Sequence, residues 1–333
     1  MEFTEQKLNI LKKTAELLNL SSSKLKKTIY VYVPPKVGST SLVSSLRIFA
    51  NHIYNIIHIH DERMLKKFIG IGNISVIDLI HYTKHVLEHE VYVINIFRQP
   101  IERKMSVFFE QIDYFHFNTT SNNINMYSSN LLIKRFNNIF PHIGIGDWFI
   151  DKYNINTPKS FDFKNKYLHV IDNNIHYITI RLIDSKEWST ILYNIFKVYL
   201  QIIPDNEGSN KNIHYAYSRF KNIYKMPKNF IDYLKNDKAL KFYTSKDEYD
   251  NYFEKWTKKS TTHVVNPYTE KEYILYTSIT RENQMYDPIQ HSHYRDEGCR
   301  CINCCKYRSI LAQKIINGKF SGNEIISHNN III

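Results

Sequence analysis

The side chains best suited to chemistry cluster in a short loop within residues 28–47, TIYVYVPPKVGSTSLVSSLR. Apolar and β-prone residues come before two prolines, and leucines at helical spacing come after the loop, so the sequence predicts a buried strand, a tight loop and a helix. Backbone N–H groups, hydroxyls and an ammonium would converge at the helix start, where the dipole favours an anion. This predicted phosphate-binding loop contains Lys36, Gly38, Ser39, Thr40 and Ser41.

The order of these residues differs from that of a nucleotide-hydrolysing P-loop. Such a loop has a glycine, four residues and then Gly-Lys-Ser/Thr, with the lysine after the glycines. Here Lys36 comes before Gly38, and no glycine lies upstream. The run PPKVGSTSL resembles instead the 5′-phosphosulfate loop of the sulfotransferases, which use 3′-phosphoadenosine 5′-phosphosulfate (PAPS) as donor.

A second stretch, VYVINIFRQPIERKMSVFFEQI, makes the resemblance more specific. It predicts a strand that ends at Arg98 and a helix that begins near Pro100. Arg98, followed by Arg103 and Ser106, is similar to the 3′-phosphate site of the family, which usually has an aspartate directly after the first arginine. The resemblance implies that Arg98 and Ser106 bind the 3′-phosphate. Arg103 fits equally well as a solvated ion-pair partner.

The expected fold is α/β. Strand and helix patterns alternate over residues 29–97, which predicts parallel strands with right-handed crossovers. The resemblance implies a three-layer sandwich with a central parallel sheet, the P-loop-NTPase-like sulfotransferase fold. Ligands of such sheets bind outside the carboxyl ends of the strands, where Lys36, His60 and Arg98 fall.

The resemblance also implies roles in sulfuryl transfer, which depends on positioning and on charge stabilisation. Lys36 would neutralise the bridging oxygen, while the loop residues from Gly38 to Ser41 would hold the 5′-phosphate. A base for the acceptor hydroxyl is expected near the second strand, and His60 suits neutral pH. Further candidates are Glu62 and two histidines of the next helix. His58 lies among isoleucines and is expected in the core. The helix histidines are His81 and His85.

The rest of the sequence predicts a β-hairpin and a division of the chain into three domains. A hairpin is expected over residues 167–184, with Asn173 and Asn174 at the turn. The resemblance to sulfotransferases ends near residue 256. The expected domains are an N-terminal helix and linker, a sulfotransferase domain and a C-terminal extension, over residues 1–27, 28–256 and 257–333.

The charge balance predicts anionic ligands. A net charge of +12 and a pI near 9.2 suit a nucleotide, a nucleic acid or an acidic polysaccharide, although a merely basic surface is the alternative. Many Ile, Asn, Tyr and Lys residues and only 9 glycines are typical of an AT-rich source genome, such as a viral one.

The sequence predicts a soluble, cytoplasmic or otherwise intracellular protein. It contains no run of 18 apolar residues, so no membrane span is expected. The N-terminus has the pattern of an amphipathic helix of mixed charge rather than that of a signal peptide.

Four cysteines lie close together near the C-terminus, spaced C-x-C-x-x-C-C after two histidines. Without a secretion signal, thiols so close together favour a soft metal such as zinc over disulfides. A redox or unpaired-thiol role, or no special role, is the alternative. The candidate ligands are Cys299, Cys301, Cys304 and Cys305, with His291 or His293.

The sequence therefore predicts a PAPS-dependent sulfotransferase. Its acceptor is expected to be a carbohydrate hydroxyl, because PIER followed by a serine resembles the polysaccharide branch of the family; a tyrosine or protein acceptor is the alternative. One rival is a non-catalytic protein that binds anions or nucleic acid on the same fold. The other is a P-loop kinase, which would want an acidic residue where this chain has Arg98.

Overall fold

The structure is a computed structural model that describes residues 3–69, 74–112, 124–204 and 213–282. Within these ranges the chain forms two compact units. Unit 1 contains Met1–Phe97 and Asp147–Asp205, and unit 2 contains Arg98–Gly146 and Asn206–Asp287. Each unit has its own core.

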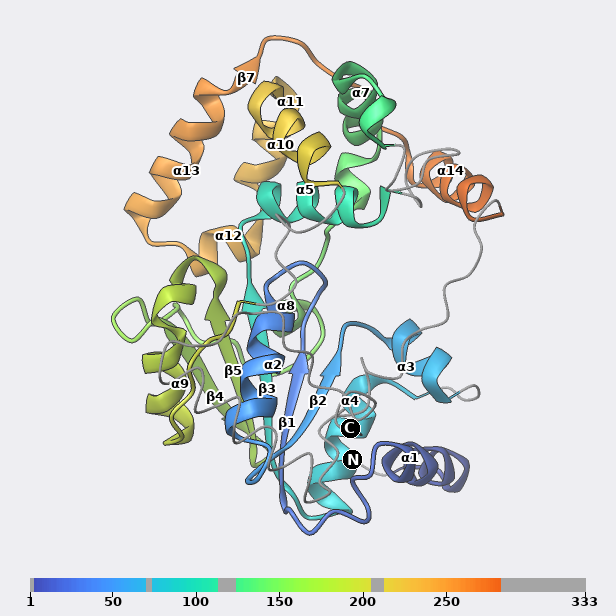
Figure 1. The fold of residues 1–333 in the computed structure, drawn as a ribbon, viewed down its shortest axis with the longest axis vertical. Helices are drawn as coiled ribbons and strands as arrows, with labels where there is room; N and C mark the ends of the chain where they lie inside the picture. The colour runs from blue at the N-terminus through green and yellow to red at the C-terminus, as the bar shows by residue number, and fades with distance from the viewer. Residues whose placement is uncertain (1–2, 70–73, 113–123, 205–212, 283–333) are drawn as a thin grey trace, which may run out of the picture. The chain divides into compact units, whose positions relative to one another are not determined.

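Unit 1 is built on a five-stranded sheet in the order β2-β1-β3-β5-β4 (Figure 1). The strands β2, β1, β3 and β5 are parallel, and β4 is antiparallel to β5. The sheet is thus mixed rather than wholly parallel, because the two-residue turn of the predicted hairpin joins antiparallel strands at this edge. The strands are β1 (Lys27–Tyr32), β2 (Asn55–Ile59), β3 (Glu90–Phe97), β4 (Tyr167–Asp172) and β5 (Ile175–Arg181).

The predicted hairpin is confirmed. Strands β4 and β5 pair from Tyr167 opposite Ile180 to Asp172 opposite Ile175. Asn173 and Asn174 form the turn with φ values of 47° and 59°. Positive φ at both central residues is what a tight hairpin turn requires, and asparagine tolerates it.

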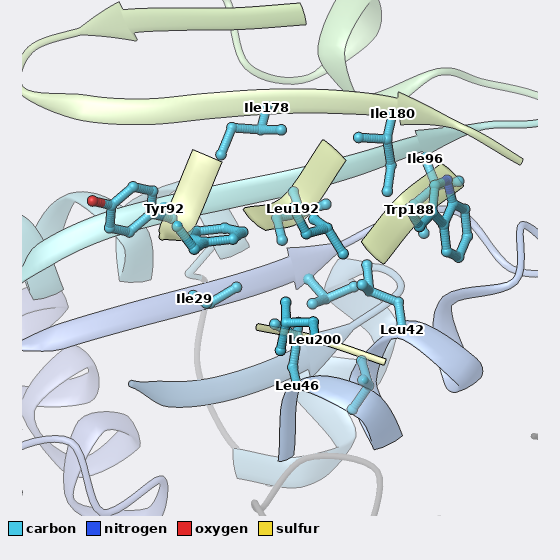
Figure 2. Close-up of a cluster of buried hydrophobic side chains, with 14 of the residues drawn as sticks. Ile29, Leu42, Leu46, Tyr92, Ile96, Ile178, Ile180, Trp188, Leu192 and Leu200 are labelled. Atoms are coloured by element: carbon cyan, nitrogen blue, oxygen red, sulfur yellow. The ribbon is translucent and has the colours of Figure 1, made fainter. Parts of the chain in front are cut away.

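Helices cover both faces of the sheet. On one face, α2 (Ser39–Phe49) and α9 (Trp188–Phe196) bury a cluster that includes Ile29, Leu42 and Leu192 (Figure 2). On the other face, α4 (Val76–His85) packs so that the Tyr30 hydroxyl lies 2.6 Å from Thr83 Oγ1. Alternate residues of β1 thus serve the two faces. Unit 1 also contains α1 (Glu5–Leu17), α3 (Glu62–Ile69), η3 (Leu182–Glu187) and α8 (Trp148–Asp151).

Unit 2 is mainly helical and packs around phenylalanines. The rings of Phe108, Phe136 and Phe220 lie against one another. The centroid of the Phe136 ring is 5.4 Å from that of Phe108 and 5.3 Å from that of Phe220. Its helices are α5 (Pro100–Glu110), α7 (Ser129–Ile139), α10 (His214–Ile223), α11 (Lys228–Lys235), α12 (Lys238–Tyr243), α13 (Lys246–Lys258) and α14 (Glu270–Glu282), with 3₁₀ turns η1 (Ile124–Met126) and η2 (Phe140–His142) and short strands β6 (Met226–Pro227) and β7 (Ser260–Thr261).

Proline marks two helix starts in unit 2, and the sequence predicted the one at Pro100. Pro100 is the first residue of α5, and Pro227 directly precedes α11. Proline fits the first helical turn because the N–H it lacks has no partner inside the helix. In the described part of the chain, no helix is long and apolar enough to cross a membrane.

Candidate anion-binding site

The loop between β1 and α2 has the backbone of an anion site. Lys36 and Gly38 both adopt left-handed conformations, with φ values of 65° and 86°. Gly38 caps α2, and a Cβ there would lie 2.7 Å from Leu182 Cδ1, so both space and φ favour glycine. Alternating backbone conformations of this kind can point successive N–H groups into one concavity.

The predicted loop residues fall at the start of α2. Ser39, Thr40 and Ser41 are its first three residues, and α2 has no acidic side chain in its first turn. The first N–H groups of a helix have no partner inside the helix, and the dipole there is positive. Ser39 is buried, whereas Lys36 is half-buried. This helix start therefore suits a negatively charged group.

Two histidines at the end of β2 contact this loop. His58 Nε2 lies 3.1 Å from Ser39 Oγ, and His60 Nδ1 lies 2.9 Å from the carbonyl oxygen of Val33. The two rings meet edge to face with centroids 4.6 Å apart, as expected for positions i and i+2 of a strand. His58 is buried as predicted, but it also bonds the loop, which sequence reasoning missed.

The contact with Val33 fixes the protonation of a neutral His60 ring. A carbonyl oxygen only accepts hydrogen bonds, so Nδ1 must carry the proton. In the neutral ring Nε2 then has the lone pair and can take up a proton. The geometry gives His60 the form that a general base needs.

The other candidate bases have different surroundings. Tyr32 donates to Glu62 Oε1 at 2.8 Å, and Lys152 Nζ lies 3.8 Å from Glu62 Oε2. Burial, followed by the nearby carboxylate, raises the pKa of Tyr32, so its hydroxyl stays protonated as a donor. His81 and His85 lie on α4, which covers the sheet face opposite α2, and burial lowers the pKa of both. Of these candidates, His60 is the one whose side chain hydrogen-bonds to the loop segment in the part of the chain that the structure describes.

A segment that sequence reasoning left without a role ties three strands together at their carboxyl ends. Asp147, the cap of α8, accepts from Asn95 of β3 at 3.1 Å. The Trp148 indole donates to the carbonyl of His60, just after β2, at 2.9 Å. The Tyr153 hydroxyl donates to the carbonyl of Tyr32, the last residue of β1, at 3.1 Å. These three hydrogen bonds hold the ends of β3, β2 and β1.

The residues predicted for the 3′-phosphate belong to unit 2. Arg98 directly follows β3, and burial lowers the pKa of its guanidinium while the nearby Tyr217 and Glu102 side chains oppose that shift. Ser106 lies half-buried on α5. Lys36 to Ser41 and His60 belong to unit 1, so the predicted donor residues are divided between the two units.

Arg103 is buried, so its interpretation as a solvated ion-pair partner is wrong. Its guanidinium donates to the carbonyls of Gly146 and Ile145 at 2.7 Å and 2.9 Å. The adjacent Lys104 donates to the carbonyls of Phe140 and Ile143 at 3.0 Å and 2.6 Å. Both side chains thus hydrogen-bond to backbone carbonyls of the segment that follows α7. The helical pattern of α5 in the sequence could not predict these partners.

The start of α5 is occupied by protein groups. The Ile101 N–H donates to the Tyr252 hydroxyl at 3.1 Å, and that hydroxyl donates to Glu102 Oε2 at 2.8 Å. Lys255 Nζ lies 2.6 Å from the other oxygen of Glu102. A tyrosine, a carboxylate and an ammonium therefore complete this helix end.

The predicted metal cluster, Cys299, Cys301, Cys304 and Cys305 with His291 or His293, lies outside the described residues. Among the residues that are described, no three His, Cys, Asp or Glu side chains come together as a metal site. Comparisons with protein-family models, curated proteins and solved structures found no match to this chain. A functional conclusion therefore depends on the chemistry of the residues themselves.

Proposed function

We propose that this protein is a PAPS-dependent sulfotransferase with a hydroxyl acceptor. The observation that carries the proposal is the junction of β1, α2 and β2. There Lys36 and Gly38 shape an anion-receptive helix start, and His60 is held beside it with Nε2 as its basic nitrogen. An anion site next to an oriented base is what transfer of a charged group to a hydroxyl requires.

In this proposal the loop binds the 5′-phosphosulfate of the donor. Backbone N–H groups and the hydroxyls of Ser39, Thr40 and Ser41 would hold the 5′-phosphate. The acceptor oxygen attacks sulfur as the bond from sulfur to the bridging oxygen breaks, and His60 Nε2 takes the hydroxyl proton. Lys36 stabilises the negative charge that develops on the leaving bridging oxygen. The products are a sulfate ester and 3′-phosphoadenosine 5′-phosphate.

A carbohydrate hydroxyl is the acceptor we favour. The net charge of +12 suits an acidic polysaccharide, and the Pro-Ile-Glu-Arg sequence that begins at Pro100 resembles the polysaccharide branch of the family. A nucleic acid would suit the charge equally well, but it would leave the oriented His60 without a role.

Binding and transfer measurements test this proposal. The full chain should bind 3′-phosphoadenosine 5′-phosphate more tightly than AMP or ATP, and it should transfer ³⁵S from labelled PAPS to a member of a polysaccharide panel. His60→Ala should lower transfer by roughly 10²–10⁴-fold without weakening donor binding. Magnesium-dependent ATP turnover without bisphosphate binding would favour the kinase, and bisphosphate binding without transfer would favour a binding protein.

Zinc in the C-terminal cysteine cluster stays a prediction. Thiolates and imidazoles are preferred zinc ligands, and a short polar segment has little apolar surface to hold it together without a metal. The purified protein should then contain about one equivalent of zinc, and chelation should leave bisphosphate binding intact. Four freely titrating thiols and no metal would contradict this prediction.

A further inference from the structure

Two histidines of the β4–β5 hairpin meet at the edge of the sheet of unit 1. His169 lies on β4, the strand that forms this edge, and His176 lies on β5 (Figure 1). Because His169 pairs with Ile178, the two histidines are diagonal neighbours on one face of the hairpin, within reach of each other. His169 Nε2 lies 2.9 Å from His176 Nδ1. The hairpin therefore brings two ring nitrogens together.

The ring of His176 is held in place, whereas that of His169 is exposed. Tyr92 of β3 is the register partner of His176, and the two rings stack with centroids 4.6 Å apart. Tyr92 also packs against Phe196, the last residue of α9, with centroids 5.2 Å apart. His169 is exposed to solvent. One ring is thus fixed by its neighbours, and the other has room to rotate and can be reached by an ion.

The distance between the two nitrogens matches that between neighbouring ligands of one metal ion. Imidazole nitrogens bind zinc at about 2.0–2.1 Å, so two of them at an angle of about 90–110° lie about 2.9–3.4 Å apart. Burial lowers the pKa of both rings, so both are neutral at neutral pH, and one donates an N–H to the other. Moving that proton to the outer nitrogen of its ring, with a rotation of His169, directs two lone pairs at one ion.

We propose that His169 and His176 form an exchangeable binding site for a divalent transition-metal ion, with water in the remaining positions. Imidazole suits zinc, copper and nickel, whereas magnesium and calcium prefer oxygen ligands. Glu90 has no ligand role here, because its carboxylate oxygens contact the Tyr92 hydroxyl and Lys27 Nζ. His176 is the second residue of β5, so this site lies at the opposite end of the sheet from the anion-binding loop. The inference does not depend on the proposed function.

Zinc titration of the full chain by calorimetry tests the proposal. The parent should show a binding event that His169→Gln and His176→Gln each weaken by roughly 10²–10⁴-fold, since each removes one of two linked ligands. Magnesium should give no such event. His52→Gln is the matched control, because His52 is an exposed histidine outside the hairpin, and it should leave the event unchanged. All variants keep the four cysteines, so these cannot cause the difference.

Thermal melting separates loss of the site from loss of the fold. Without added metal, both hairpin variants should melt like the parent, because the substitution at each position keeps a polar side chain. Added zinc should raise the melting temperature of the parent and of His52→Gln more than that of either hairpin variant. Equal zinc affinity in the parent and both hairpin variants would overturn the site. An event that appears only at millimolar zinc, or that His52→Gln weakens equally, would show adventitious binding only.

Discussion

Helices α2 and α5 occupy similar places in the chain, each directly after a strand, but their first turns differ in charge. Each helix comes after a buried strand of the parallel part of the sheet. Helix α2 begins after left-handed Gly38 and has no acidic residue in its first turn. Helix α5 begins with Pro100, carries Glu102 in its first turn and gives the Ile101 N–H to Tyr252. The first turn of α2 thus carries no carboxylate, whereas Glu102 and Tyr252 neutralise and cap the start of α5.

This difference shows that a strand, a turn and a helix do not by themselves make an anion site. The positive end of the helix dipole attracts an external anion less strongly where a carboxylate of the protein already lies beside it. Glu102 is such a carboxylate in the first turn of α5. An anion bound near α5 would then depend on side chains such as Arg98. The two helix starts should therefore respond differently to substitution.

The largest effect is expected from Lys36→Met in the loop before α2. Charge on the bridging oxygen grows only as the sulfur–oxygen bond breaks, so Lys36 should matter more in the transition state than in the ground state. Turnover of PAPS should fall by roughly 10²–10³-fold, with a much smaller change in donor affinity. Steady-state kinetics and calorimetry measure the two quantities. Equal losses in both would make Lys36 a simple anchor.

Acid should lower the stability of unit 1 through His89, at the opposite end of the sheet from the loop. The buried His89 Nδ1 lies 2.8 Å from Thr28 Oγ1, and burial lowers the pKa of His89 from 6.5 to about 4. Below pH 6.5 the His89 imidazole binds a proton in the unfolded chain, whereas in the folded chain it stays neutral until about pH 4. Stability should thus fall by roughly 3 kcal/mol over this window.

Urea unfolding at a series of pH values measures this loss. His89→Asn should flatten the slope between pH 6.5 and about 4, because the variant has no imidazole to protonate there. An unchanged slope in His89→Asn would assign the acid sensitivity to other groups.

Gly38→Ala and Gly144→Ala separate backbone strain from anion binding. Both glycines have positive φ, 86° and 55°, and Gly144 lies in unit 2, where a Cβ would come within 3.2 Å of Lys104. Each substitution should cost about 1–2 kcal/mol of stability, because alanine is strained in the left-handed region. Only Gly38→Ala should also weaken binding of 3′-phosphoadenosine 5′-phosphate. Equal weakening by both variants would show that the loss reflects general instability.

The smallest effect is expected from Tyr252→Phe. It removes the hydroxyl that accepts from Ile101 and donates to Glu102, so stability should fall by about 1 kcal/mol. Bisphosphate affinity should not change, because the α5 start is not used for the ligand. Thermal melting and calorimetry test the two expectations. A clear change in affinity would contradict the contrast between the two helix starts.

Local patterns in the sequence were sufficient for the main elements of unit 1. The apolar run before Pro34 predicted β1, and Asn173 with Asn174 predicted the hairpin turn. In unit 2, helical spacing and Pro100 predicted α5 in the same way. These features depend on neighbours within a few positions, so periodicity and turn chemistry reveal them.

Contacts between distant residues could not be predicted. The bond from His58 to Ser39 and the bond from the Trp148 indole to the carbonyl of His60 depend on how elements pack. Arg103 shows the same limit, because an arginine on an amphipathic helix looks solvated until its buried carbonyl partners are known. The sequence therefore predicts which residue types form the candidate site, but their hydrogen-bond partners depend on the packing of the folded chain.

The three hydrogen bonds of the Asp147–Tyr153 segment also constrain how the sequence can vary. Asp147, Trp148 and Tyr153 hydrogen-bond to β3, to the residue after β2 and to β1, respectively. The number of residues between them must therefore match the distances between these strand ends. Lys152 is exposed and could be exchanged, but inserting or deleting one residue between Trp148 and Tyr153 would detach at least one strand end. Evolution should therefore conserve the length of this segment more strictly than its composition.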